Sequence, residues 1–430
     1  MRTLILIGMI VLCVASAHSQ TPLSPNSADS VAPAHVVDTS IVTVPEPSEK
    51  AWAYHVGNTW IWIADTILGF AVPALFLFTG FSAKLRTWAA HIGRKRFFTI
   101  ALYFAVFIVL STIVSFPLDY YSSFVREHAY GLSDQAFGKW FGDQLKGLAI
   151  SMIVGALLLW MPYALLRKSP RRWWLWTGLC AIPLIFFAMM ITPVWVEPLF
   201  NDFGPMQSKP LEAKILALAS RAGIEGSRVY EVNKSVDTKT LNAYVTGFLS
   251  TKRIVLWDTI IKKLDDDELL CVMGHEMGHY VLGHVVEGLF VISLMLILTL
   301  YVIHRTAGGL LRRFGARFGF TELGDIASLP LIMLLFSVYG FIASPLFNAY
   351  SRHHEHEADR FGLELTHNNH AMATAFAKLQ TEDLAIPRPE WILVILRSSH
   401  PTLGDRIDFA NSYHPWRSGG ESKYENLFKK

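Results

Sequence analysis

Six long apolar stretches constrain what this chain can fold into more than any other feature. Each could cross the hydrocarbon core of a bilayer as an α-helix, which takes about 20 apolar residues. Hydrophobic residues also make up 52% of the chain, more than is usual for a soluble protein. We therefore predict a mostly α, multi-pass membrane protein. The predicted spans are 59–80, 97–116, 147–166, 173–192, 285–304 and 326–346.

The N-terminus carries a shorter apolar run of a different kind. Arg2 precedes the run at 4–14, and the Ala-Ser-Ala sequence at 15–17 resembles a signal-peptidase site. We predict that residues 1–17 are a signal peptide, and the alternative is an uncleaved helix that forms a seventh span. Residues 18–58 are predicted to be a disordered leader, because Pro, Ser, Thr and Val dominate the sequence and cannot build a core.

Lysine and arginine residues indicate the orientation of the chain. They are concentrated in three connections, 81–96, 167–172 and 305–317, and loops of this kind stay on the cytoplasmic side. By alternation, the segment 193–284 and the tail 347–430 face outward. This predicts a bacterial inner-membrane protein with its chemistry on the periplasmic side, and the endoplasmic reticulum membrane is the alternative.

Cysteine content and charge exclude two other classes of protein. The three cysteines are Cys13, Cys180 and Cys271, which form neither a disulfide framework nor a Cys-x-x-Cys metal site. The net charge of +3 is small and scattered, so no nucleic acid partner is expected.

The sequence His-Glu-Met-Gly-His at 275–279 indicates a metal site. A helix advances by about 100° per residue, so His275 and His279 share one face and can bind one ion, with Glu276 beside the attacking water. This is the pattern of a zinc protease. Two histidines leave at least one further protein ligand to be found.

His284 is the first candidate for that ligand. It lies nine residues after His275 and, on a continuous helix, about 140° around the axis from His279. We therefore expect His284 to point away from the metal, toward solvent or an interfacial hydrogen bond.

A second cluster of candidates follows the sixth predicted span. The motif helix is predicted to run directly into the fifth span, and antiparallel spans would bring this cluster to the same membrane face. Glu355 and Asp359 are one helical turn apart, so Glu355 could bind zinc while Asp359 holds a ligand histidine through its second ring nitrogen. Composition leaves five residues in competition: His353, His354, Glu355, His356 and Glu357.

Several short sequences resemble the type I CAAX prenyl endopeptidases, which are integral membrane zinc metalloproteases of the gluzincin type. The resemblance covers roughly residues 60–412, and the order and spacing of the motifs make it specific. The matching sequences are Pro198-Leu199-Phe200-Asn201, Asn242-Ala243-Tyr244, Lys252-Arg253-Ile254-Val255-Leu256, the 275–279 motif, Glu355-x-x-Ala358-Asp359, and His400-Pro401 with Arg406.

The resemblance implies a complete metal site with one Zn²⁺ per chain. Glu355 would be the third ligand, beside His275 and His279, and Asp359 would be the hydrogen-bonded partner that supports the ligands. The competition among the five candidates is thereby resolved in favour of Glu355.

The resemblance also implies how a substrate is held. Asn242, Ala243 and Tyr244 would lie on an edge strand that pairs with an extended peptide. His400 would donate a hydrogen bond to the oxyanion, and Arg406 would order the carboxylates or the substrate.

Members of this family have seven spans around a large chamber. The resemblance therefore implies a polytopic helical bundle enclosing a chamber, with a small α+β zinc metalloprotease domain built on extensions of the last two spans. The seventh span would have to be the signal-like segment or be missing. The predicted regions are 59–192 (four spans), 193–284 (α+β region with the motif helix), 285–346 (two spans) and 347–430 (third-ligand helix and C-terminal protease region). Within the α+β region we predict a helix at 210–221 and strands at 228–232, 243–248 and 253–258.

We predict a zinc-dependent metalloendopeptidase that acts in contact with membrane lipid on a peptide or prenylated-peptide substrate, as in CAAX-box processing. One alternative is a quality-control protease that cleaves unlipidated hydrophobic peptides. Another is a zinc transporter or sensor, which would need neither the base Glu276 nor the strand at Asn242.

Overall fold

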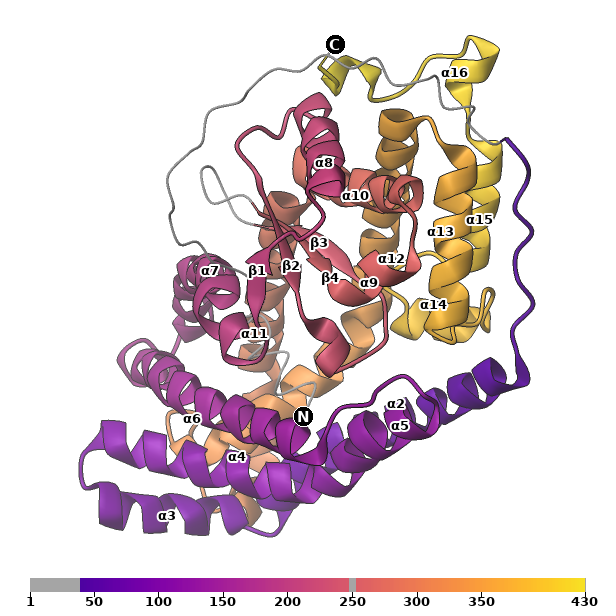
Figure 1. The fold of residues 1–430 in the computed structure, drawn as a ribbon. Helices are drawn as coiled ribbons and strands as arrows, with labels where there is room; N and C mark the ends of the chain where they lie inside the picture. The colour runs from indigo at the N-terminus through magenta and orange to yellow at the C-terminus, as the bar shows by residue number, and fades with distance from the viewer. Residues whose placement is uncertain (1–38, 247–252, 430) are drawn as a thin grey trace. The chain divides into compact units, whose positions relative to one another are not determined.

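The computed structural model describes residues 39–246 and 253–429, and helices dominate this part of the chain (Figure 1). The chain divides into two compact units. Of the described residues, the first unit contains Val56–Met189 and Val286–Pro345, and the second contains 39–55, 190–246, 253–285 and 346–429. The predicted signal peptide at 1–17, and with it the question of a seventh span, lies outside the described residues.

Long apolar helices make up most of the first unit. Among the described residues, six helices have the length and composition to cross a membrane, which confirms the six predicted spans. These helices are α2 (Glu49–Phe78), α4 (Arg96–Tyr120), α6 (Phe137–Lys168), α7 (Trp173–Ile191), α11 (His284–Phe318) and α12 (Leu329–Thr366). The shorter helices are α3 (Phe81–Gly93) and α5 (Arg126–Ala129).

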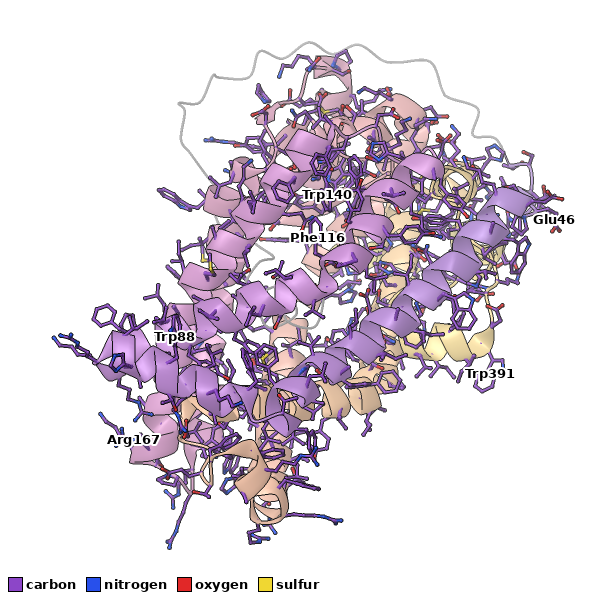
Figure 2. The ribbon with its side chains drawn as sticks, turned by 90° about the horizontal axis from the view of Figure 1, so that it is seen from below. Glu46, Trp88, Phe116, Trp140, Arg167 and Trp391 are labelled. Carbon is purple, nitrogen blue, oxygen red and sulfur yellow. The ribbon has the colours of Figure 1, made fainter. Side chains whose placement is uncertain are left out.

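Aromatic side chains fill much of the interior of the first unit. Tyr103 and Phe107 on α4 are fully buried, and their rings stack with centroids 6.2 Å apart. Further along α4, Phe116 contacts Trp140 of α6 with ring centroids 6.0 Å apart (Figure 2). Lipid provides little hydrophobic drive for helix association, so close packing of this kind holds such helices together.

The segment 39–48, which we call the N-terminal strap, is hydrogen-bonded to the C-terminal helices. Val42 donates its amide to Asn411 Oδ1 at 3.1 Å, and Asn411 Nδ2 donates to the Val42 carbonyl at 2.8 Å. Gln380 Nε2 donates to the Pro45 carbonyl at 2.6 Å. These contacts, and the start of α2, correct the expectation that the disordered leader continues to residue 58. The partners of the strap are distant in sequence, so its composition gave no sign of them.

A four-stranded sheet lies in the second unit, with the order β1-β2-β4-β3. The strands are β1 (Phe203–Pro205), β2 (Arg228–Val232), β3 (Ala243–Thr246) and β4 (Arg253–Trp257). β2 and β4 are parallel, whereas β1 and β3 run antiparallel to their neighbours. Because β3 comes last in the strand order, it is an edge strand among the described strands. The three predicted strands are present where they are described, and β1 is too short to leave a periodic signal.

Helices cover the sheet of the second unit and form one buried cluster with it. The cluster includes Ile215 of α8, Ile254 of β4, Met273 of α10 and Phe361 of α12. The helices of this unit are α8 (Lys209–Arg221), α9 (Asp258–Lys263), α10 (Asp266–Val281), α13 (Asn369–Glu382), α14 (Trp391–Arg397), α15 (Leu403–Ser412) and α16 (Pro415–Ser418). The helix predicted at 210–221 matches α8.

Local sequence fixes both ends of α10, which carries the 275–279 motif. At its start, Asp265 and Glu268 form a capping box in which each side chain accepts the other's amide at 2.9 Å. After its end, Gly283 adopts a φ of 74°, a left-handed conformation that glycine takes without steric cost. α11 then begins at His284. The expectation that the motif helix runs directly into the fifth span is therefore wrong, because a left-handed glycine separates the two helices.

A carboxylate supports the chain where it enters β3. Asp383, which follows α13, accepts the amide of Leu241 at 3.2 Å, two residues before the strand begins. Burial raises the pKa of Asp383 to about 7, although the hydrogen bond from Leu241 opposes this shift.

The Asp383→Asn variant should be more stable than the native protein at pH 8 and little changed at pH 4. The pKa of Asp383 in the folded state, about 7, lies above the usual value for an aspartate, about 3.9. The folded protein therefore binds more protons than the unfolded chain between these values, and stability falls as the pH rises through this window. Asparagine can still accept the Leu241 amide but cannot ionise. Thermal unfolding in detergent at both pH values measures the effect, with exposed Glu421→Gln as the control. An Asp383→Asn melting temperature no higher than the native one at pH 8 would contradict it.

Candidate metal centre

Two helices pass close enough for side chains from both to reach one point. α10 and α12 meet at glycines: a Cβ atom on Gly362 would lie 2.8 Å from the backbone nitrogen of His275, and one on Gly278 would lie 3.2 Å from Cα of Ala358. A side chain at Gly362 would therefore force the helices apart. The absence of a side chain at these two glycines therefore allows the two helices to bring their ligand residues together.

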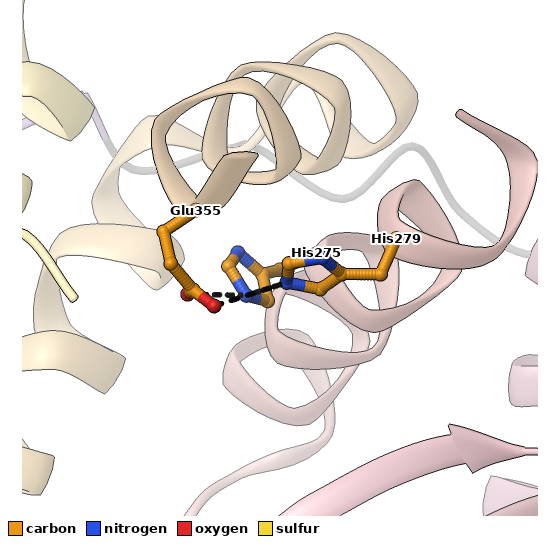
Figure 3. A group of neighbouring side chains, drawn as sticks. All are labelled: His275, His279 and Glu355. Atoms are coloured by element: carbon orange, nitrogen blue, oxygen red, sulfur yellow. Dashed lines mark hydrogen bonds and ion pairs between the residues drawn. The ribbon is translucent and has the colours of Figure 1, made fainter. Parts of the chain in front are cut away.

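His275 and His279 of α10 converge with Glu355 of α12 (Figure 3). His275 Nε2 lies 3.2 Å from His279 Nε2 and 3.4 Å from Glu355 Oε2, and His279 Nε2 lies 3.4 Å from Glu355 Oε1. Ligand atoms around a tetrahedral zinc ion, with bonds of about 2.0–2.1 Å, are about 3.3 Å apart. The donor atoms and their spacing therefore fit a zinc ion.

A buried pair of charges orients His275. Asp359 Oδ1 lies 2.7 Å from His275 Nδ1, which leaves Nε2 for the metal. Arg406 of α15 donates to both carboxylate oxygens of Asp359, at 2.6 and 2.9 Å. Burial opposes protonation of His275, but the Asp359 carboxylate outweighs it and raises the pKa of His275 to about 10. The negative charge that holds a proton at this ring also favours a bound cation.

Glu276 lies beside the converging ligand atoms without joining them. Its Oε1 is 4.0 Å from His275 Nε2. Burial raises the pKa of Glu276, although His275 and His279 oppose the shift. A carboxylate with a raised pKa takes up a proton more readily at neutral pH, which is what a general base requires.

His400 approaches Glu355 from the loop between α14 and α15. His400 Nε2 lies 3.3 Å from Glu355 Oε1, and the His400 side chain is 60% exposed. It therefore stands on the side of the site that solvent can reach.

The edge strand β3 lies beside α10. Ala243 is buried in the same hydrophobic cluster as Met277 of α10, while Asn242 just before it is exposed. The Tyr244 hydroxyl donates to Glu197 at 2.9 Å, so this side chain is engaged within the protein. β3 pairs with β4 on one side, and among the described strands none pairs with its other side.

Other members of the candidate cluster after the sixth span have different partners. Glu357 accepts a hydrogen bond from the Tyr424 hydroxyl. The His356 ring packs on Phe409 with centroids 4.3 Å apart, and His353 is exposed. In the described residues, only Glu355 of this cluster belongs to a group able to hold a metal ion.

Among the described residues, His284 lies outside the group that could hold a metal ion, as expected, but its ring contacts the back of His279 and does not point away from it. His284 Nδ1 is 3.0 Å from His279 Nδ1. The expected rotation of about 140° between His279 and His284 holds only for a continuous helix. Here Gly283 turns the chain between α10 and α11. A glycine directly before His284 was the available signal, since glycine after a helical segment is typical of a C-terminal stop.

Comparison with known proteins gives consistent matches over most of the chain. Peptidase family M48 matches residues 205–414, and the CAAX prenyl protease N-terminal family, with five membrane helices, matches residues 37–202. The uncharacterized metalloprotease YhfN of Bacillus subtilis is 38% identical to this chain, and the match covers 85% of this chain and 86% of YhfN. The CAAX prenyl protease 1 homolog of Dictyostelium discoideum is 30% identical and covers 84% of both chains.

A solved structure shares the architecture. The crystal structure of S. mikatae Ste24p matches with a TM-score of 0.73 at 25% identity, and covers 84% of this chain and 87% of that chain. The resemblance to the CAAX prenyl endopeptidases is thereby confirmed. The chain belongs to peptidase family M48, and it is a multi-pass membrane metalloendopeptidase.

Proposed function

We propose that this protein is a zinc metalloendopeptidase that holds one zinc ion with His275, His279 and Glu355. The observation that carries this proposal is the spacing of the three ligand atoms, 3.2, 3.4 and 3.4 Å, which suits tetrahedral zinc. A transporter or sensor could use the same ligands, but it would have no use for Glu276 beside them.

Each neighbouring residue then has a defined task. Bound zinc would supply Lewis acidity, which polarises the scissile carbonyl and acidifies water. Glu276 accepts a proton from the attacking water and passes it to the leaving amine, so no covalent intermediate is needed. His400 donates a hydrogen bond to the oxyanion. Arg406 holds Asp359, and Asp359 keeps the His275 ring in its orientation.

The edge of β3 suits an extended peptide substrate. The backbone from Asn242 through Ala243 to Tyr244 would pair with the substrate, a mode that reads the peptide chain rather than its side chains. The Tyr244 side chain would take no direct part, because its hydroxyl is bonded to Glu197.

We further propose that the site lies on the periplasmic side of a bacterial inner membrane. The basic segments at 81–96, 167–172 and 305–317, which include α3 and the C-terminal ends of α6 and α11, support this orientation. A site on that side does not meet cytosolic prenylated proteins. We therefore propose that the substrates are extended hydrophobic peptides, with or without a prenyl group, so that quality control of membrane peptides is included in the activity.

The Glu276→Gln variant should lose peptide cleavage and keep its zinc, because Glu276 is the base and not a ligand. Glu355→Ala should lose zinc as well as activity. Metal analysis and a peptide-cleavage assay on the purified variants test both statements, with Glu357→Ala as a control that should retain zinc. Turnover by Glu276→Gln would refute the mechanism, and zinc retention by Glu355→Ala would refute the ligand set.

A reporter that is active only after export should be active when fused after Lys430. The reason is that three basic segments are expected to keep the opposite ends of the spans in the cytoplasm. A cytoplasmic reporter fused at the same position is the matched control. Activity of that second reporter would place the site on the cytoplasmic side.

Prenylation should lower the KM of a peptide and leave its kcat nearly unchanged. Buried methylene groups add affinity, at most about 0.8 kcal/mol each, but the reacting groups are the same for both peptides. Steady-state cleavage of farnesylated and unmodified copies of one peptide measures the two constants. Cleavage confined to the farnesylated copy at every concentration would show that the lipid is required.

A further inference from the structure

His284, which is outside the proposed ligand set, contacts the proposed ligand His279 at the ring nitrogen that does not face the metal. His284 is the first residue of α11, and its Nδ1 lies 3.0 Å from Nδ1 of His279. The other ring nitrogen of His279, Nε2, is the atom that converges with His275 and Glu355. The two nitrogens of His279 therefore face two different partners.

Only one arrangement of protons suits both contacts when a metal is bound. Nε2 of His279 must offer its lone pair to the ion, so the ring proton of the neutral imidazole is on Nδ1. That N–H then donates to His284 Nδ1, which must accept. His284 consequently carries its own proton on Nε2.

The surroundings of His284 hold its ring in this position. Gly283 has a φ of 74°, which ends α10 and lets the next residue turn back toward His279. The His354 ring packs edge-on against His284 with centroids 4.1 Å apart, and Tyr350 packs against His354 at 4.3 Å. The four rings thus form a continuous column from His279 to Tyr350.

We propose that His284 is a positioning residue for the metal ligand His279, whose tautomer and ring orientation it fixes by accepting the Nδ1 proton. The inference rests on the metal site proposed above. It gives the two ligand histidines different supports. His275 is held by the carboxylate of Asp359, whereas His279 is held by the neutral ring of His284.

Metal affinity is the direct test, because a partner that orients a ligand histidine typically contributes a factor of about 10 to 100 in affinity. The full-length protein in detergent is titrated with zinc against a chelating dye, without any substrate. His284→Leu removes the acceptor, and we expect zinc affinity to fall about 10- to 100-fold. His284→Asn places an amide oxygen near the former Nδ1 and should recover most of the native affinity.

Two further variants separate orientation from general damage. Gly283→Ala removes none of the four rings but strains the left-handed turn that positions His284. Like His284→Leu, it should lower the zinc affinity. His356→Leu changes a histidine that packs on Phe409 instead, and it should bind zinc as tightly as the native protein.

The outcomes distinguish this inference from the proposal on which it rests. If the native protein binds no zinc, the proposed function fails. If the native protein binds zinc and His284→Leu binds it equally tightly, His284 has no positioning role. Equal weakening of His284→Asn and His284→Leu would also overturn the inference, because it would show that volume or packing matters and the acceptor does not.

Discussion

The close crossing of α10 and α12 is the constraint on which the rest of the site depends. Gly362 leaves room for the backbone of His275, and Gly278 leaves room for the backbone of Ala358. One helix contributes two histidines at the spacing of one turn, and the other contributes a carboxylate. Neither helix alone has three ligands on one face. The proposed metal site is therefore a property of the contact between the helices, and any side chain that separates them would separate the proposed ligands.

Sequence reasoning worked where the signal was local and periodic. The six spans follow from apolar length, and the pairing of His275 with His279 follows from the geometry of a single helix. The choice of Glu355 over four neighbouring candidates needed a family resemblance, because a contact between residues 80 positions apart, such as His275 and Glu355, leaves no periodic trace. The sequence correctly placed His284 outside the ligand set, but its contact with His279 was missed, because one left-handed glycine changes the direction of the chain that follows it. The strap was mistaken for disorder because its partners are distant in sequence.

Paired charges stabilise the buried part of the proposed metal site. Asp359 is 1% exposed and Arg406 is 9% exposed, and an unpaired charge at such a place would be strongly destabilising. Each charge compensates the other, and Asp359 Oδ1, which accepts from Arg406, also contacts Nδ1 of His275. Glu355 instead contacts three imidazole rings, those of His275, His279 and His400. A divalent ion held between these groups would supply the positive charge that faces the Glu355 carboxylate.

The N-terminal strap and its partners are synthesised at very different times. Val42 leaves the ribosome early, yet its hydrogen-bond partner Asn411 is translated 369 residues later. Asn411 lies on α15, the helix that also carries Arg406. Until α15 has emerged, Asp359 lacks its guanidinium partner and the strap lacks its hydrogen bonds to Asn411. A growing or truncated chain therefore has the ligand helices without the ion pair that orients His275.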